Sequence, residues 1–416
     1  MAQTFRKDLQ FYKFCLYGFL KNLRFFEPFL ILFFAEKGIS YLQIGTLYAI
    51  REVLKNLLEI PTGVVADALG RRRTMIYSFV SYIASFVIFF FSSQYGLFVI
   101  AMVFFSFGEA FRTGTHKAMI FEYLAIKGWK DQKVYYYGNT RAWSQIGSAL
   151  SSLIAASIVF LSDSYKSVFL YATIPYVMDL LLMISYPKEL DGDIRNIEGD
   201  KIKRNFVKVT REFIHSFKDI EILRAVANIS VYSGFYKAIK DYIQPVLKTF
   251  ALALPILLSL EGKQRTSIVI GAVYFVIYIL TSFASRISGK TAERFKSLRT
   301  PLNITMIAGF SMGILSGIFY NTGLLAVSIA LYVGIYLIEN LRKPMGISYI
   351  TDMMHRDILA TALSAQSQAS SLVAAVVALL IGFLADLYGI GWSLAVVSIL
   401  LISASPFCMA WERQRR

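Results

Sequence analysis

The sequence contains few of the residues that disulfides and metal centres require. Among 416 residues there are only two cysteines and three histidines. Cys15 and Cys408 lie in or beside apolar segments, without the spacing of a disulfide framework or a metal site. The sequence also shows no nucleophile–base pattern. An enzyme is therefore the class of protein that it supports least, and we expect neither a metal nor a cofactor.

Acidic residues and long polar stretches are also scarce. The chain has 27 Asp and Glu against 43 Lys and Arg, a net charge of +16, and 56% of its residues are hydrophobic. Such a basic balance can indicate nucleic-acid binding, but here the basic residues lie in short loops between apolar runs. We therefore predict no nucleic-acid partner. Basic loops of this kind orient a chain in a lipid bilayer.

Apolar runs of about 20 residues recur along the chain, and each is long enough to cross a bilayer as a helix. We predict an all-α polytopic membrane protein with about twelve spans. The spans are approximately 11–35, 41–66, 74–93, 97–125, 134–161, 166–186, 219–250, 266–289, 300–320, 323–350, 357–384 and 389–411. Loops rich in Lys and Arg alternate with loops almost free of them, which places both termini in the cytoplasm. We expect a monomer in the plasma membrane, the inner membrane of a bacterium or archaeon.

One long polar segment divides the chain. We predict an N-terminal six-helix bundle at 1–186, a cytoplasmic linker at 187–218 and a C-terminal six-helix bundle at 219–416. The linker contains a basic amphipathic stretch that suits the anionic inner leaflet, although a plain solvated connector is the alternative. The halves carry related patterns, Glu109-x-x-Arg112 in the fourth span and Glu339-x-x-Arg342 in the tenth. Duplication of a six-span unit is one route to a transporter with its site between the halves.

Ionisable residues fall near the middle of five predicted spans. A single charge at this depth costs about 2.5–3.5 kcal/mol, so these side chains must line a watery cavity or pair with one another. Several pairs have i,i+3 spacing, which places both members on one helix face. Structural bridges between helices are the alternative for any one residue. The residues are Lys21, Arg24, Glu27, Arg51, Glu52, Lys55, Glu109, Arg112, Lys237, Lys240, Asp241, Glu339, Arg342 and Lys343.

The sign of these charges predicts the class of substrate. The set has nine cations and five anions, and a cavity with surplus Lys and Arg attracts an anion. Arginine suits a carboxylate, phosphate or sulfate because it can donate two parallel hydrogen bonds. We predict that a small anionic solute contacts Lys21, Arg24, Arg51, Lys55, Arg112, Arg141, Lys237, Lys240, Tyr274, Arg342 and Gln366.

The buried acids suggest proton coupling. A carboxylate beside an arginine can take up a proton when that arginine turns to the substrate, because the cation no longer favours the charged form. We predict this role for Glu109 and Glu339, followed by Glu27 and Asp241. His116, one turn beyond Arg112, is a candidate relay, although a simple hydrogen-bonded histidine is the alternative.

The segment between the second and third spans carries a recognisable motif, Gly63-x-x-Ala66-Asp67-x-x-Gly70-Arg71-Arg72. A tight cytoplasmic hairpin needs glycine for close backbone approach and arginine to hold it on the inner side. The motif resembles the loop 2–3 signature of the major facilitator superfamily, and an ordinary basic hairpin is the alternative.

The resemblance implies two six-helix bundles that rock around a central site, lined by the first and fourth helices of each half. It also implies an inner gate at which Gly63 and Gly70 shape the turn. In this gate Asp67 meets the start of span eleven near 357–361, and Arg71 or Arg72 pairs with an acid such as Glu122. In the second half the motif is degraded, with Glu293 displaced from the expected Asp position.

We therefore predict a secondary active transporter that moves a small anionic solute by alternating access, coupled to protons by symport or antiport. One alternative is efflux of drugs or amphiphiles by proton antiport, which would favour an apolar, aromatic cavity with one or two acids. The other is a receptor of the same fold that does not transport. A second Gly-x-x-Ala-Asp, at 382–386, falls at the outer end of span eleven, where we expect a helix end and turn rather than a gate.

Overall fold

A computed structural model of the chain describes residues 6–192, 220–353 and 359–410. Within these ranges the chain is almost entirely helical, and no strand is present. The predicted all-α polytopic fold class is confirmed. The basic amphipathic stretch predicted in the linker, and the contact expected for Asp67 near 357–361, lie outside the residues or side chains that the structure describes.

Two compact units make up the structure. Unit 1 comprises Met1–Phe29, Leu54–Phe206 and Ile270–Phe275, and unit 2 comprises Leu30–Val53, Val207–Val269 and Val276–Arg416. This division crosses the predicted boundary between the bundles, because a segment of the first half groups with the second and a short piece of the second groups with the first.

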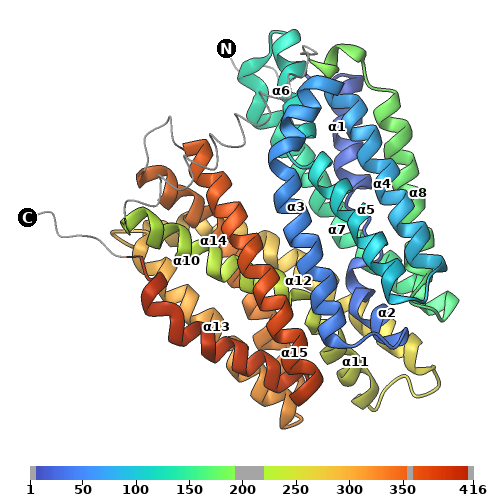
Figure 1. Ribbon diagram of the computed structural model, residues 1–416, viewed down its shortest axis with the longest axis vertical. Helices are drawn as coiled ribbons and strands as arrows, with labels where there is room; N and C mark the ends of the chain where they lie inside the picture. Colours follow the sequence, from blue (N-terminus) through green and yellow to red (C-terminus); the bar gives the residue numbers. More distant parts are fainter. Residues whose placement is uncertain (1–5, 193–219, 354–358, 411–416) are drawn as a thin grey trace, which may run out of the picture. The chain divides into compact units, whose positions relative to one another are not determined.

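Unit 1 is built on helices α1 and α4 to α8. Helix α4 packs on α5 and α8, and α1 packs on α7 and α8 (Figure 1). Tyr82, Phe86 and Tyr176 fill the space between them with edge-to-face and stacked rings. The helices are α1 Leu9–Leu20, α4 Arg71–Phe91, α5 Tyr95–Arg112, α6 Thr115–Ile126, α7 Lys133–Ser162 and α8 Ser167–Ile184, with 3₁₀ turns η1 Glu27–Phe29, η2 Lys130–Gln132 and η3 Lys188–Asp191.

Unit 2 contains α2, the first part of α3 and the helices of the second half. Helix α10 packs on α14 and α15, and α13 packs on the same two helices. The elements are α2 Leu30–Glu36, α3 Tyr41–Leu69, α10 Ile220–Ile239, η4 Lys240–Tyr242, α11 Ile243–Ala253, α12 Gly262–Glu293, α13 Arg299–Asn321, α14 Leu325–Met353 and α15 Leu359–Cys408. Helix α15 comprises predicted spans eleven and twelve, joined at a kink where Gly389 has φ 80°.

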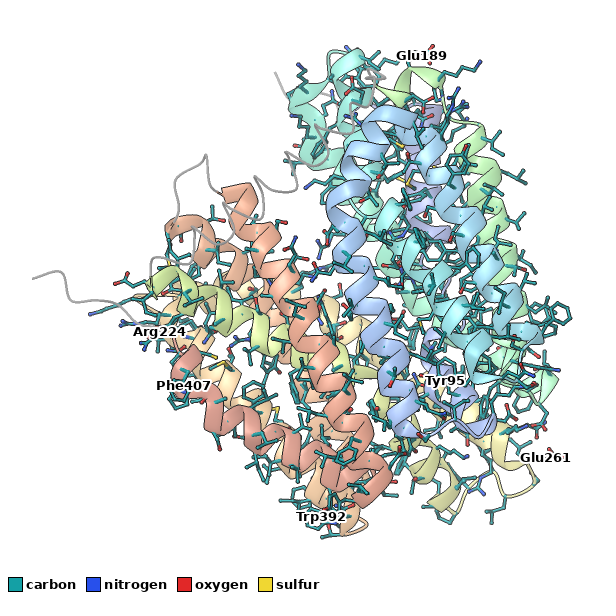
Figure 2. The ribbon with its side chains drawn as sticks, in the orientation of Figure 1. Tyr95, Glu189, Arg224, Glu261, Trp392 and Phe407 are labelled. Carbon is teal, nitrogen blue, oxygen red and sulfur yellow. The ribbon has the colours of Figure 1, made fainter. Side chains whose placement is uncertain are left out.

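Eight helical segments within the described ranges are long and apolar enough to cross a membrane. Because α15 covers two predicted spans, the predicted spans missing from this set are one, two and seven, which carry several of the mid-depth charges. Large apolar side chains point away from the helices, as Trp392 and Phe407 do (Figure 2). Their exposure is the pattern expected of a surface that faces lipid.

Predicted spans one and seven are interrupted helices, not the continuous ones expected from their length. In span one, α1 ends at Leu20 and α2 begins only at Leu30; in span seven, α10 ends at Ile239 and a 3₁₀ turn follows. The expectation that Lys21 and Arg24 share one helix face is therefore wrong. A window of about 20 residues averages over such breaks, although charged residues (Lys21, Arg24 and Glu27 in span one, Lys240 and Asp241 in span seven) mark both of them in the sequence.

Tyrosine hydroxyls stabilise both interruptions. A helix end leaves backbone carbonyls without partners, which is costly where water is excluded. Tyr176 donates to the carbonyl of Lys21 at 3.3 Å. In the second half Tyr332 donates to the carbonyl of Ile239 at 2.5 Å, and Tyr336 donates to that of Lys240. The two halves thus satisfy equivalent helix ends in the same way, with tyrosines from different spans.

Close packing of α1 against α7 gives a test of this arrangement. A Cβ at Gly147 would lie 2.5 Å from the backbone oxygen of Phe19, whereas one at Gly138, on the same helix, would meet nothing within 4 Å. We expect Gly147→Ala to lower the free energy of unfolding by about 1–3 kcal/mol through overpacking. Gly138→Ala should leave it unchanged or slightly raised, because alanine favours helix. Thermal unfolding in detergent compares them, and equal effects would contradict the described contact.

Candidate substrate-binding site

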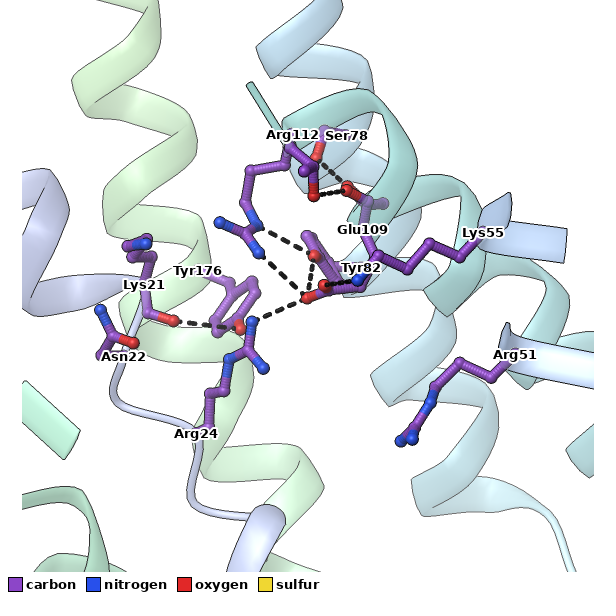
Figure 3. Close-up of polar contacts among 12 residues, drawn as sticks. Lys21, Asn22, Arg24, Arg51, Lys55, Ser78, Tyr82, Glu109, Arg112 and Tyr176 are labelled. Carbon is purple, nitrogen blue, oxygen red and sulfur yellow. Dashed lines mark hydrogen bonds and ion pairs between the residues drawn. The ribbon is translucent and has the colours of Figure 1, made fainter. Parts of the chain in front are cut away.

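One carboxylate, that of Glu109, is shared by three cations in unit 1 (Figure 3). Its Oε1 accepts hydrogen bonds from Arg24 Nη2 at 2.7 Å and Arg112 Nη2 at 3.2 Å, and its Oε2 lies 3.8 Å from Lys55 Nζ. The Tyr82 hydroxyl also donates to Oε1, at 2.7 Å. Four groups from four segments of the chain therefore converge on a side chain that is nearly buried.

The break in the first span places Arg24 in this cluster. Arg24 lies in the non-helical stretch between α1 and η1, whereas Lys55 comes from α3 and Arg112 from the last turn of α5. Lys21, at the start of the break, lies with its Nζ 5.7 Å from the centre of the Tyr17 ring. The cluster thus contains four cations and one partnered acid, and a surplus of positive charge remains.

One buried donor in the cluster is unused by the described residues. Arg24 Nε is buried and has no hydrogen-bond partner among them. Arg112 donates through Nε to the Tyr82 hydroxyl at 3.1 Å and through Nη2 to Glu109. Both guanidinium groups are partly exposed, at 23% and 13% of the side-chain surface. Such groups suit a carboxylate, phosphate or sulfate.

His116 lies in an aromatic cage. It stacks on Tyr17 with ring centres 3.6 Å apart, meets Phe14 edge to face, and its Nε2 is 3.2 Å from the Tyr186 hydroxyl. This is the hydrogen-bonded, packed histidine that the sequence allowed as the alternative to a relay.

In unit 2, Glu339 and Arg342 do not pair, although their spacing suggested it. Glu339 accepts hydrogen bonds from Ser233 at 2.8 and 3.1 Å. Arg342 is 3% exposed and donates to Leu302 O, Thr305 Oγ1, Asn228 O and Asn228 Oδ1. Its guanidinium also lies over the Tyr232 ring at 4.7 Å. Arg342 therefore fastens α14 to α10 and α13, and its position does not support the predicted contact with substrate.

A second polar network in unit 2 joins the first part of α3 to α10, η4 and α15. Asp241 accepts from the Tyr48 hydroxyl at 3.0 Å and lies 3.7 Å from Lys240 Nζ. Glu52 accepts from Ser371 Oγ at 3.0 Å and lies 3.2 Å from Arg51. The Arg51 guanidinium stacks over Tyr48, and Lys237 Nζ lies 3.4 Å from Ser371 Oγ. The structure thus brings Arg51, Lys237, Lys240 and Asp241 into one neighbourhood.

The other predicted site residues are more dispersed. Arg141 on α7 is exposed, and Lys343 on α14 is exposed as well. Tyr274 on α12 is buried, and Gln366 on α15 donates to Ser370 Oγ at 2.9 Å. Glu27 begins η1 and is partly buried. None of these contacts by itself indicates a ligand.

The motif near residue 70 forms a small ionic cluster at the end of α3. Arg71 Nη1 lies 3.2 Å from Glu122 Oε2. Asp191, which the sequence did not suggest, accepts from the backbone N–H of Arg72 at 2.9 Å and lies 3.6 Å from its Nε. Gly70 has φ 93°, and a Cβ there would lie 2.6 Å from Asp191 Oδ1. Glycine is therefore required here twice over. The surroundings of Gly63 and Asp67 lie outside what the structure describes.

Comparison with known proteins decides the family. Residues 14–371 match the model of the Major Facilitator Superfamily. The chain belongs to this superfamily. It is 22% identical over 391 residues to the "Uncharacterized MFS-type transporter YxaM" of Bacillus subtilis (strain 168), which covers 91% of this chain and 89% of that protein. The family and this relative are transporters, in agreement with the prediction that the chain is not an enzyme.

Solved structures share the fold at low sequence identity. The nucleoside transporter NupG matches with a TM-score of 0.71 and 13% identity, over 98% of this chain and 98% of that one. A POT family transporter in complex with 5-aminolevulinic acid matches with a TM-score of 0.68 and 15% identity, over 95% and 96%. These structures show that the fold is shared, and the family match together with the curated relative supports multi-pass membrane transport.

Two Glu→Gln substitutions test how strongly the cluster depends on its acid. Glu109→Gln leaves three cations close together in a nearly buried place, and we expect it to lower the free energy of unfolding by about 3–5 kcal/mol. The matched control, Glu122→Gln, removes one partner of a more exposed pair and should cost about 0–1 kcal/mol. Thermal unfolding of both purified variants measures the difference. A Glu109→Gln variant as stable as Glu122→Gln would contradict the central position of Glu109.

Proposed function

We propose that the protein is a secondary active transporter for a small anionic solute, coupled to protons. The observation that supports this most is the charge of the Glu109 cluster. Arg24, Lys55 and Arg112 surround one partnered carboxylate, and Lys21 Nζ lies over the Tyr17 ring in the same unit, so an anion that enters gains Coulomb energy and charge-assisted hydrogen bonds. The same positive charge would repel a cationic amphiphile, and this disfavours the alternative in which the protein exports such compounds.

The proposed anion-binding residues are Lys21, Arg24 and Arg112. Arg24 Nε has no partner among the described residues, and Arg112 donates through Nε to Tyr82 and through Nη2 to Glu109. Within unit 2, Lys237 and Lys240 lie at the equivalent helix break. Discontinuous helices with charged ends near the middle of the membrane are a known way of building a transporter site.

Of the two acids predicted first for proton coupling, Glu339 is held less strongly in its charged form than Glu109. Glu109 is surrounded by three cations that favour its charged form. Glu339 has its hydrogen bonds to a neutral serine hydroxyl, and among the described residues no cation lies within 4 Å of its oxygens. In this mechanism both termini lie in the cytoplasm. The Arg71–Glu122 pair lies at the inner gate, as the family resemblance implies.

Two substitutions that change the charge of the anion site in opposite directions test its role. Arg112→Gln removes a donor and a positive charge, so the Kd for sulfate should rise by about 10- to 100-fold, the equivalent of one charged hydrogen bond. Glu109→Gln removes a negative charge, so sulfate should bind at least as tightly as to the wild type. Isothermal titration of folded, purified protein measures both.

The opposite signs separate electrostatics from damage to the site. Loss of packing would weaken binding in both variants, whereas the proposal requires them to differ. Unchanged binding of sulfate, phosphate and carboxylates by Arg112→Gln would contradict the assignment of Arg112.

A further inference from the structure

A second buried acid of unit 1, Asp179, makes no hydrogen bond with the proposed anion-binding side chains that the structure describes. It is on α8, in the middle of the apolar sequence that spans the membrane, and it has no exposed surface. Neither of its carboxylate oxygens has a hydrogen-bond partner among the described residues. By contrast, the nearby Glu109 accepts three hydrogen bonds.

The groups around Asp179 come from several elements. The cations that act on it are Lys21, at the break after α1, and Arg112 of α5. The charge of Asp179 also acts on three tyrosine hydroxyls, those of Tyr17, Tyr176 and Tyr186. Helix α4 directs Tyr82 to Glu109 and Arg112, and the charged side chains of α7, Lys133 and Arg141, are both exposed. His116 lies on the far side of Tyr17, stacked on its ring.

Two opposing effects act on this carboxyl group. Burial without a hydrogen bond makes the ionised form very costly, and a group in that position usually takes up a proton instead. The positive charges of Lys21 and Arg112 favour the ionised form. The same two cations belong to the proposed anion site, so an anion bound to them would cancel the charge that favours ionisation.

We propose that Asp179, which shares Lys21 and Arg112 with the proposed anion site, takes the coupling role in place of Glu339 and binds the proton that is carried in the same direction as the anion. This inference rests on the proposed anion site. A bound anion screens Lys21 and Arg112, a proton from solution then adds to an Asp179 oxygen, and both leave together when the anion departs. Because such coupling is reciprocal, protonation of Asp179 must strengthen anion binding by the same factor. The sign of the coupling therefore indicates symport.

The experiment measures sulfate binding to the purified full-length protein as a function of pH. Sulfate remains a dianion over the working range, so its own titration does not contribute. For the wild type we expect the Kd to rise by about 5- to 150-fold from the acidic to the alkaline end, the usual range of coupling between two sites. Asp179→Asn, which mimics the protonated form, should bind sulfate with a nearly pH-independent Kd close to the acidic wild-type value.

Two control variants accompany this measurement. Asp179→Glu keeps a titratable carboxyl group and should keep a pH-dependent Kd, even if the midpoint moves. Glu189→Gln removes an exposed acid of η3 (Figure 2), and it should reproduce the wild-type profile. In liposomes, Asp179→Asn should retain sulfate exchange but lose sulfate accumulation driven by a proton gradient.

The outcomes distinguish this inference from the proposed function. If sulfate, phosphate and carboxylates all fail to bind to the wild type, the anion site and the coupling are both wrong. If sulfate binds and Asp179→Asn shows the wild-type pH profile, only the coupling is wrong. Should Asp179→Asn not fold, infrared difference spectra of the wild type decide. Sulfate must then increase the carbonyl band of a protonated carboxylic acid, and no increase would overturn the inference.

Discussion

The sharing of the Glu109 carboxylate by Arg24, Lys55 and Arg112 is the interaction on which the site in unit 1 depends. One negative charge holds three positive side chains within 4 Å of its oxygens. Without it, mutual repulsion between the three cations in a poorly solvated place would lower the stability of the folded protein. The acid therefore stabilises the positive site without neutralising it, and the unneutralised charge is what would attract an anion.

Interrupted helices bring these charges together. In a continuous first span Lys21 and Arg24 would lie on one face of the helix. Instead α1 ends just before Lys21, and helical structure begins again only at η1. Each interruption exposes backbone carbonyls, and Tyr176, Tyr332 and Tyr336 satisfy them. Both halves use tyrosine hydroxyls for this purpose, although the tyrosines come from spans that are not equivalent in the two halves.

Much of this could be predicted from the sequence, because apolar length, loop charge and mid-span ionisable residues depend on local composition. The pairing of Arg71 with Glu122 followed from the family resemblance, although its role as a gate stays a prediction. Pairing inside the bundles was harder: Glu339 and Arg342 have the same spacing as Glu109 and Arg112, yet Arg342 turns to Asn228 and backbone carbonyls. Partners from distant segments decide such contacts. Asp179 was missed, although a single Asp in an apolar span was a visible signal.

The most direct test of the account compares ligands that differ only in charge. Each carboxylate that binds to the purified wild-type protein would be titrated beside its own amide, for example succinate beside succinamide, with Kd measured by calorimetry at one pH. The account predicts that the anions bind and that the amides of the same size and shape do not. Equal affinity for both members of a pair, or preference for the amide, would show that the positive charge around Glu109 does not select the substrate.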